Sequence, residues 1–277
     1  MTRDELGRLF ALDGKVAAVT GAGGVLYSGI SKALGVLGVK LAILDIREEA
    51  ARAVADDVNK AGGHAIGLAC DVLTRESIEA ARDAVIRQFG HVDILINGAG
   101  GNHPKATATD QLAFFDIPPE ATRWVFELNC LGSILPSQVF GKHMAERKEG
   151  IILNTSSMCA FTPLTRVIAY SAAKAAVSNF TQWLATHMAR NYSPTIRVNA
   201  IAPGFFLGDQ NRYLLVDEKT GDLTPRGKTI IEHTPMGRFG VPDDLIGTVV
   251  WLLSPAAAFV TGIVVPIDGG FSAFSGV

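Results

Sequence analysis

The stretch KVAAVTGAGG at residues 15–24 joins a short apolar run to a turn that contains Gly21, Gly23 and Gly24. An apolar run of this length is typical of a buried strand in a parallel sheet. The residues after the turn, as far as Gly38, are expected to form a helix. Glycine at such a turn lets the backbone bend sharply and approach a pyrophosphate at the helix N-terminus. A tight turn without a ligand has the same composition, so the motif alone does not establish a phosphate site.

Short apolar runs and helical segments continue to alternate along the chain. Six further runs are expected to be strands buried on both faces: 40–45, 64–70, 92–97, 150–155, 196–201 and 263–268. Helical periodicity is found at 48–61, 75–89, 121–147, 169–190 and 242–253. This alternation predicts one α/β domain over residues 1–277, a Rossmann-type, doubly wound parallel sheet of about seven strands flanked by helices. The segments 100–119 and 205–232 are longer than a connection needs, which predicts substrate loops.

The composition excludes several classes of protein. A chain of 277 residues, 48% of them hydrophobic, can bury a sizeable core without disulfides. The 25 Lys and Arg residues are matched by 27 Asp and Glu residues, so no nucleic-acid partner is expected. No apolar run reaches the roughly 18 residues of a membrane span, and residues 1–10 carry charges where a signal peptide would be apolar. We therefore predict a cytoplasmic protein with no membrane partner.

The cysteines and histidines do not form a metal motif. Cys70, Cys130 and Cys159 are an odd number without CxxC spacing, which predicts neither a disulfide framework nor a zinc site. His103 has no second histidine or carboxylate at ligand spacing. No metal ion is expected.

Asp45, at the end of the second predicted strand, indicates the nucleotide that the glycine turn would bind. A carboxylate there accepts hydrogen bonds from both hydroxyls of an adenosine ribose and repels a 2′-phosphate, which favours NAD. Arg47 is a signal in the opposite direction, because its guanidinium could pair with a 2′-phosphate. NADP therefore stays open as the alternative.

Tyr170 and Lys174 stand one helical turn apart and share a face of the predicted helix 169–190. A neighbouring ammonium favours the phenolate, so Lys174 is expected to lower the pKa of Tyr170 and make it a usable base. Each residue also has a structural interpretation: Tyr170 as a core aromatic, Lys174 as a solvated charge, Ser157 as a strand-end turn residue and Asn129 as a helix cap.

In combination, these motifs resemble the short-chain dehydrogenase/reductase family over nearly the whole chain. The resemblance rests on the glycine turn, Asn97-Gly98-Ala99-Gly100, the spacing of Ser157 and Tyr170, Tyr-x-x-x-Lys at 170–174, Pro203-Gly204 and Asp268-Gly269-Gly270. It implies that Ser157 holds the substrate oxygen and that Tyr170 is the general acid and base. It also implies that Lys174 binds the nicotinamide ribose and tunes Tyr170, while Asn129 anchors a water that relays protons.

The same resemblance implies a set of cofactor-binding residues. These are Gly21, Gly23, Gly24, Leu26, Asp45, Asp71, Val72, Asn97, Ala99, Gly100, Tyr170, Lys174, Pro203, Gly204 and Phe206. Asp71 and Val72 would contact the adenine, and Asn97 would support the central sheet.

Two departures from the family pattern affect the cofactor site. The family turn usually reads Thr-Gly-x-x-x-Gly-x-Gly, but Val25 and Tyr27 occupy the later glycine positions here. A tyrosine there leaves less room beside the pyrophosphate, so the turn is expected to use Gly23, Gly24 or the pair 28–29 instead. Gly208 stands where the family often has a threonine for the carboxamide, and backbone groups around 206–207 are expected to replace it.

The polar loops indicate the substrate. Within the family, segments 100–105, 163–166, 208–212 and 271–277 resemble members described as D-mannonate oxidoreductases or fructuronate reductases. Guanidinium groups bind carboxylates in a bidentate manner, which suits an anionic polyol such as a sugar acid. The candidate substrate residues are His103, Lys105, Arg166, Gln210 and Arg212. The family resemblance also implies a homo-oligomer, a tetramer in many members.

Three functions therefore remain in view. The first is an NAD-dependent dehydrogenase of a small polar alcohol. The second, suggested by the altered glycine turn, is a dinucleotide-binding regulatory or scaffold protein that has lost the reaction; the presence of Asn129, Ser157, Tyr170 and Lys174 favours the enzyme. The third is a reductase of acyl-carrier substrates, which needs an apolar trough and a basic docking patch, and the polar loops argue against it.

Overall fold

The computed structural model describes residues 1–208, 212–217 and 219–276. The described residues form a single parallel sheet of seven strands in the order β3-β2-β1-β4-β5-β6-β7. The strands are β1 (Val16–Thr20), β2 (Lys40–Asp45), β3 (His64–Ala69), β4 (Ile94–Asn97), β5 (Gly150–Thr155), β6 (Ile196–Pro203) and β7 (Val264–Ile267). The predicted doubly wound sheet is thus confirmed, with strand ends that differ from the predicted ones by one or two residues.

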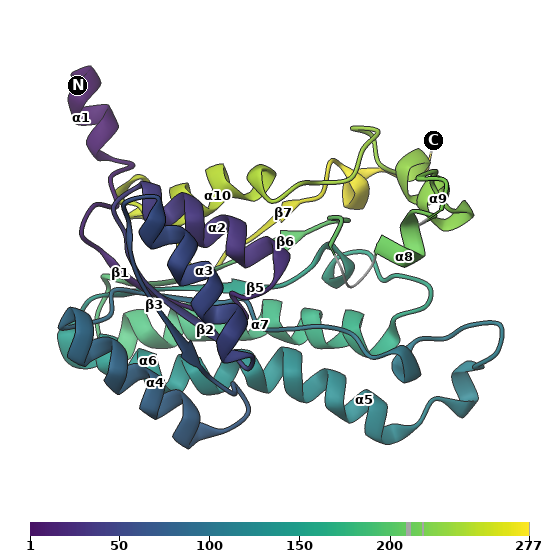
Figure 1. The fold of residues 1–277 in the computed structure, drawn as a ribbon, viewed down its shortest axis with the longest axis horizontal. Helices are drawn as coiled ribbons and strands as arrows, with labels where there is room; N and C mark the ends of the chain where they lie inside the picture. Colours follow the sequence, from purple (N-terminus) through teal and green to yellow (C-terminus); the bar gives the residue numbers. More distant parts are fainter. Residues whose placement is uncertain (209–211, 218, 277) are drawn as a thin grey trace.

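Helices cover both faces of the sheet, as Figure 1 shows. Helices α2 (Val25–Val36), α3 (Glu48–Lys60) and α10 (Asp243–Leu253) lie on one face, and α4 (Arg75–Phe89), α6 (Gly132–Arg147) and α7 (Ile168–Asn191) lie on the other. The short helix α1 (Arg3–Arg8) precedes β1 and buries no residue. Among the helices of the described residues, none is both long and apolar enough to cross a membrane.

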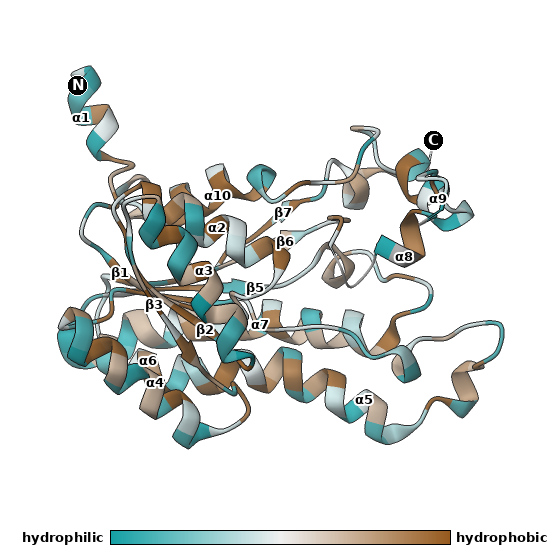
Figure 2. Cartoon of the chain, in the orientation of Figure 1, coloured by the Kyte–Doolittle hydropathy of each residue, from teal (hydrophilic) through white to brown (hydrophobic). Residues whose placement is uncertain are grey.

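The alternation of side chains along β1 separates two cores. Ala17 and Val19 belong to the apolar cluster under α2, α3 and α10, whereas Val16 and Ala18 belong to the cluster under α4, α6 and α7. Successive side chains of a strand point to opposite faces, so a central strand must be apolar throughout. Figure 2 shows the apolar residues gathered in the strands and on the inner faces of the helices.

The expectation that every strand is buried on both faces is wrong for β3 and β7. Both lie at the edges of the sheet, and their residues are mostly half-buried. An edge strand has a neighbour on only one side, so its residues keep contact with solvent. The central strands β1 and β4 are buried over their whole length.

The helix predicted at 121–147 is interrupted. Helix α5 (Pro119–Phe126) passes into a π-helical turn at Glu127–Leu131 before α6 begins. The side-chain amide of Asn129, at the centre of this turn, donates a hydrogen bond to the Val125 carbonyl at 2.8 Å. Single π turns inside α-helices are frequent at functional sites.

The two long segments contain more structure than the predicted loops. Segment 205–232 includes α8 (Arg212–Leu215) and most of α9 (Pro225–His233), and 3-10 turns occur at Pro104–Ala106 and Phe114–Asp116 in segment 100–119. In Figure 1, both segments extend beyond the carboxyl ends of the strands. Ligands of open α/β sheets bind at this edge, so the long segments border the candidate site.

Candidate active site

The glycine turn forms a sharp corner against the end of β4. Gly21 has φ +64°, and a Cβ there would lie 2.7 Å from the Ala99 Cα. Gly24 is the N-cap of α2, and the backbone N–H groups of Val25 and Leu26 begin that helix. Within the part of the chain that the structure describes, neither N–H group has an acceptor. Unpaired N–H groups at the start of a helix suit a pyrophosphate.

Tyr27 lies inside the protein and not beside the phosphate edge, so the expected loss of room there is wrong. Only 4% of the tyrosine is exposed, and its ring packs so closely on Gly98 that a Cβ at position 98 would lie 2.6 Å from it. The Tyr27 hydroxyl is hydrogen-bonded to Thr155 Oγ1, which itself donates to the Asn97 carbonyl at 2.5 Å. Because Gly98 has no side chain, the Tyr27 ring fits at a position where the family usually has glycine.

Ser28 and Gly29, the alternative contributors to the phosphate site, both take part in the hydrogen bonding and packing of α2. The Ser28 hydroxyl donates to the Val25 carbonyl at 3.0 Å, within the first turn of α2. A Cβ on Gly29 would lie 2.9 Å from the Pro242 Cβ, so this glycine allows α2 to pack near the start of α10. The N-terminal glycines 21–24 remain as the approach to the cofactor.

Asp45 is held at the end of β2 with both carboxylate oxygens paired. Oδ2 accepts from the Gly23 N–H at 3.0 Å, and Oδ1 accepts from the Arg47 N–H at 3.0 Å. The Arg47 guanidinium, although 69% exposed, lies 3.6 Å from the same Oδ1. Arg47 is therefore engaged by Asp45. After β3, Asp71 accepts hydrogen bonds from the Leu73 N–H and the Thr74 hydroxyl, and Val72 is buried.

The end of β4 is tied to its neighbours by polar side chains. Asn97 donates to Asn154 Oδ1 at 2.8 Å, which links β4 to β5. Thr20 Oγ1 accepts from the Ala99 N–H at 3.3 Å, which links β4 to β1. A Cβ on Gly100 would lie 2.8 Å from Asn129 Oδ1 and 3.2 Å from Lys174 Nζ, so only glycine fits there.

The structure brings Asn129, Ser157, Tyr170 and Lys174 together at the carboxyl ends of β4 and β5. Asn129 Nδ2 donates to the Gly101 carbonyl at 2.7 Å. Lys174 Nζ donates to the Thr155 carbonyl at 2.8 Å and lies 5.5 Å from the centre of the Tyr170 ring. Ser157, whose hydroxyl donates to the Pro203 carbonyl at 3.5 Å, lies beside Tyr170 and lowers the pKa of the phenol, but this does not outweigh burial.

Burial dominates the electrostatics of the tyrosine–lysine pair. It raises the pKa of Tyr170, and the neighbouring Cys159 adds to this shift. Burial also lowers the pKa of Lys174 to about 8. The expectation that Lys174 lowers the pKa of Tyr170 is thus wrong for this structure, because both groups are desolvated and the ammonium is directed to the Thr155 carbonyl. Burial thus shifts both groups toward their neutral forms: Tyr170 stays a neutral phenol, whereas Lys174, with a pKa of about 8, is still mostly protonated at pH 7.

The chain that leaves β6 passes over the start of α2. Pro203 ends the strand, and the Gly204 N–H donates to the Ile267 carbonyl at 2.9 Å. Phe206 is buried, and Gly208 lies close to Val25. Position 208, where the family often has threonine, therefore lies near the helix that begins the cofactor site.

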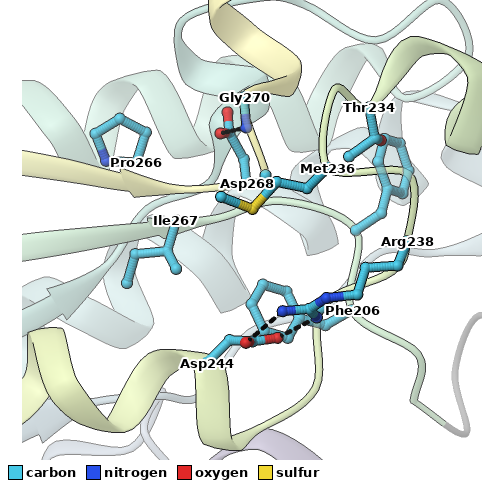
Figure 3. A pocket seen from close by; sticks show the side chains of 12 residues that line it. Phe206, Thr234, Met236, Arg238, Asp244, Pro266, Ile267, Asp268 and Gly270 are labelled. Atoms are coloured by element: carbon cyan, nitrogen blue, oxygen red, sulfur yellow. Dashed lines mark hydrogen bonds and ion pairs between the residues drawn. The ribbon is translucent and has the colours of Figure 1, made fainter.

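A cavity of about 410 Å³ lies beside this chain, at the carboxyl ends of β6 and β7 (Figure 3). Its wall includes Phe206 and an ion pair in which the Arg238 guanidinium donates to both oxygens of Asp244, at 2.6 and 2.7 Å. The lining residues are Phe205, Phe206, Thr234, Met236, Arg238, Gly240, Asp244, Pro266, Ile267, Asp268, Gly269 and Gly270. Ser157 and Tyr170 are not among these lining residues, so the cavity lies beside the candidate site and does not include it. Of its polar residues, Asp268 belongs to the motif Asp268-Gly269-Gly270 noted in the sequence, whereas Thr234, Arg238 and Asp244 escaped the sequence-based prediction.

The candidate substrate residues do not all converge. His103 Nδ1 accepts from the Lys105 N–H at 3.1 Å and its ring packs against Trp124, so this histidine organises its own turn. Lys105 and Arg166 are exposed, and Arg212 is the exposed first residue of α8. Gln210 lies outside the described residues. Among the described residues, no three His, Cys, Asp or Glu side chains are grouped to hold a metal ion.

The Arg166 backbone joins the two sides of the site. Its carbonyl accepts from the Ala108 N–H at 2.9 Å, which attaches segment 100–119 to the chain between Ser157 and Tyr170.

Known proteins resemble this chain over most of its length. A family profile described as enoyl-(acyl carrier protein) reductase, adh_short_C2, matches residues 27–272. An uncharacterized oxidoreductase of Bacillus subtilis, UxuB, is 48% identical over 275 residues, which are 96% of this chain and 98% of the relative. The 7alpha-hydroxysteroid dehydrogenase of Escherichia coli is 33% identical over 259 residues, 94% of each protein.

One solved structure adds a bound cofactor. A crystal structure from Haemophilus influenza with bound NAD, provisionally assigned as a D-mannonate oxidoreductase, is 47% identical and superposes with a TM-score of 0.90. The match covers 96% of this chain and 98% of that chain. Since the profile and these relatives span nearly all of the sheet and its helices, the chain belongs to the short-chain dehydrogenase/reductase family and is a nicotinamide-dependent oxidoreductase of CH–OH groups.

Proposed function

We propose that the protein is an NAD-dependent dehydrogenase that interconverts a secondary alcohol and a ketone of a small sugar acid, of the D-mannonate or D-fructuronate type. The observation that carries the proposal is the convergence of Asn129, Ser157, Tyr170 and Lys174 at one edge of the sheet. A regulatory or scaffold protein that only bound a dinucleotide would gain nothing from a buried neutral phenol beside a lysine whose pKa lies close to neutral pH.

The side chains divide the proton chemistry between them. Tyr170 would exchange a proton with the substrate oxygen, because its phenol stays protonated in the buried site. Ser157, beside Tyr170, would hold the same oxygen. Lys174 would hold the nicotinamide ribose, and its pKa of about 8 lets it pass a proton near neutral pH. When bound, the nicotinamide supplies or accepts the hydride.

The proposed preference for NAD rests on Asp45. Its carboxylate is fixed by the Gly23 N–H and is 7% exposed at the end of β2, where the adenosine ribose of a Rossmann-type site lies. The 2′-phosphate of NADP would be repelled by this negative charge. Arg47 does not offset it, since its guanidinium already pairs with Asp45. The NAD in the structure from Haemophilus influenza agrees with this choice.

The proposed substrate class rests on the exposed cations Lys105, Arg166 and Arg212 of the loops that border the candidate site, and on the relative assigned to D-mannonate. Arg166 precedes Tyr170 by four residues, just before α7 begins, and has no ion-pair partner among the described residues. A guanidinium at this place suits a carboxylate.

The proposal also includes association of the chain as a homotetramer, as many members of the family do. Trp183 on α7 and Phe259 near β7 are large apolar residues that the single chain leaves 57% and 105% exposed. Light scattering during size-exclusion chromatography tests the subunit number, and a monomeric mass would contradict it.

The substrate is tested by following nicotinamide absorbance in both directions with NAD and with NADP. The panel contains D-mannonate and D-fructuronate, the neutral polyol D-mannitol, a 7α-hydroxysteroid and an enoyl thioester. We expect turnover with the sugar acids and NAD. Turnover of the steroid or the thioester without the sugar acids would overturn the substrate class, and no turnover of any compound would favour the scaffold.

A further inference from the structure

Arg226 lies in an unfavourable place for a positive charge. It is the second residue of α9, after Pro225, and Thr224 caps this helix by accepting from the Gly227 N–H at 3.1 Å. The N-terminal end of a helix carries a partial positive charge, so a cation in the first turn is disfavoured. Arg226 is also half-buried, which removes part of its hydration.

The guanidinium of Arg166 lies near enough to Arg226 to repel its charge. Burial lowers the pKa of Arg226, and repulsion from the nearby Arg166 lowers it further. No hydrogen bond or ion pair joins either guanidinium to another described residue. Partial burial, the nearby charge of Arg166 and the helix N-terminus thus all disfavour the positive charge of Arg226. Among the described residues, no negative group pairs with it.

The packing places this pair of arginines beside the proposed reacting centre. Leu215 of α8 and Ile230 of α9 form an apolar cluster with Met158, and Leu164 and Tyr170 pack against that cluster. Segment 205–232 therefore rests on the chain that runs from Ser157 to Tyr170 and contains Arg166.

The backbone around both arginines is well anchored. The Arg166 carbonyl accepts from the Ala108 N–H at 2.9 Å. The Thr224 N–H donates to the Leu215 carbonyl at 3.0 Å, and Gly227 lies so close to the same carbonyl that a Cβ would meet it at 2.2 Å. Such anchoring maintains two like charges near each other without a ligand.

We propose that Arg166 and Arg226 form one anion subsite, which receives the carboxylate of a substrate whose reacting oxygen lies at Ser157 and Tyr170. This inference rests on the proposed function and names its specificity residues. A carboxylate between two guanidiniums accepts charge-assisted hydrogen bonds from both and removes their repulsion. A neutral polyol would leave the repulsion in place, so the subsite selects acids.

The first test compares Arg226→Gln with Lys228→Gln, which removes an exposed charge from the same helix. For the sugar acid that the wild type turns over best, Arg226→Gln should lower kcat/KM by about 10-fold to 150-fold, the range expected for charge-assisted hydrogen bonds. Lys228→Gln should change it by less than about 2-fold. Arg226→Lys should recover only part of the loss, because lysine lacks the planar fork.

Binding to the cofactor-free protein separates this inference from the proposed function. D-gluconate is the probe and D-mannitol the neutral control, with binding followed by calorimetry. Wild type should bind D-gluconate more tightly than D-mannitol, and both Arg166→Gln and Arg226→Gln should remove that difference. The melting temperature of Arg226→Gln should equal or exceed that of the wild type, since an unbalanced charge is lost.

Three results would overturn the subsite. These are equal losses for acid and neutral substrates, an Arg226→Gln variant that behaves like Lys228→Gln, and D-gluconate binding that survives both arginine variants. If the wild type turns over no sugar acid but its D-gluconate binding depends on both arginines, the proposed substrate is wrong and the subsite stands. If Arg226→Gln does not fold, Arg166→Gln decides the outcome by the same measurements.

Discussion

Replacing Lys174 by methionine should change how the stability of the protein depends on pH. Lys174 is 2% exposed, and burial lowers its pKa from 10.5 to about 8. Below pH 8 the lysine is protonated in both the folded and the unfolded chain, so the cost of burying the charge is fully present. Between pH 8 and 10.5 the folded chain releases the proton while the unfolded chain keeps it. The wild type therefore becomes more stable as pH rises through this window.

The size of the effect follows from the two pKa values. A shift from 10.5 to about 8 corresponds to about 3 kcal/mol of stability lost at neutral pH. Most of this returns by pH 10, so the wild type should gain about 2.5 kcal/mol relative to Lys174→Met between pH 7 and 10. The hydrogen bond that Lys174 donates to the Thr155 carbonyl is absent from the variant at every pH and shifts the comparison by a constant.

Equilibrium urea unfolding of the cofactor-free protein at pH 7, 8, 9 and 10 measures this difference. The free energy of unfolding of wild type minus that of Lys174→Met is plotted against pH, which cancels titrations common to both proteins. Lys228→Met, at an exposed position of α9, is the control and should give a flat line. A flat line for Lys174→Met as well would refute the reasoning, because the buried ammonium would then carry no cost.

Four further substitutions, at three positions, test the rest of the site. Tyr170→Phe should lower kcat by about 100-fold to 10,000-fold with little change in NADH affinity, and a variant that keeps a tenth of the wild-type kcat contradicts its role as acid and base. Asp45→Ala should reduce the NAD preference in kcat/KM and release Arg47 for a 2′-phosphate; a wild type that already prefers NADP refutes the assignment. Tyr27→Phe removes the hydrogen bond to Thr155 and should lower the free energy of unfolding in urea by about 1 kcal/mol. Tyr27→Gly should lower it by about 3 to 5 kcal/mol, because it leaves a cavity beside Gly98. A smaller loss for Tyr27→Gly than for Tyr27→Phe would contradict this packing.

Local patterns were sufficient to predict the sheet and the position of its ligand edge. The residues of β1 from Val16 to Val19 are apolar without interruption because the strand is buried on both faces, and that pattern is visible in the sequence. The one-turn spacing of Tyr170 and Lys174 places them on one helix face whatever surrounds them, and the structure keeps them together. Elements defined by periodicity and turn residues are encoded locally, so they could be predicted.

Segment 205–232 was predicted as a loop although it contains α8 and most of α9. Thr224 followed by Pro225 is a recognisable start of a helix, so this signal was available in the sequence. The nearness of Arg226 to Arg166 had no such signal, since their two segments come together only through the packing of distant parts of the chain.

The balance of charges at the candidate site likewise depended on tertiary structure. A tyrosine and a lysine one turn apart predict that the ammonium stabilises the phenolate, but the fold buries both and directs Lys174 to the Thr155 carbonyl. Tyr27 follows the same rule: in the sequence it occupies a glycine position near the phosphate, and in the fold it fills space beside Gly98. Sequence specifies which groups are present and their local geometry, whereas burial and through-space charge arise only when segments far apart in the chain come into contact.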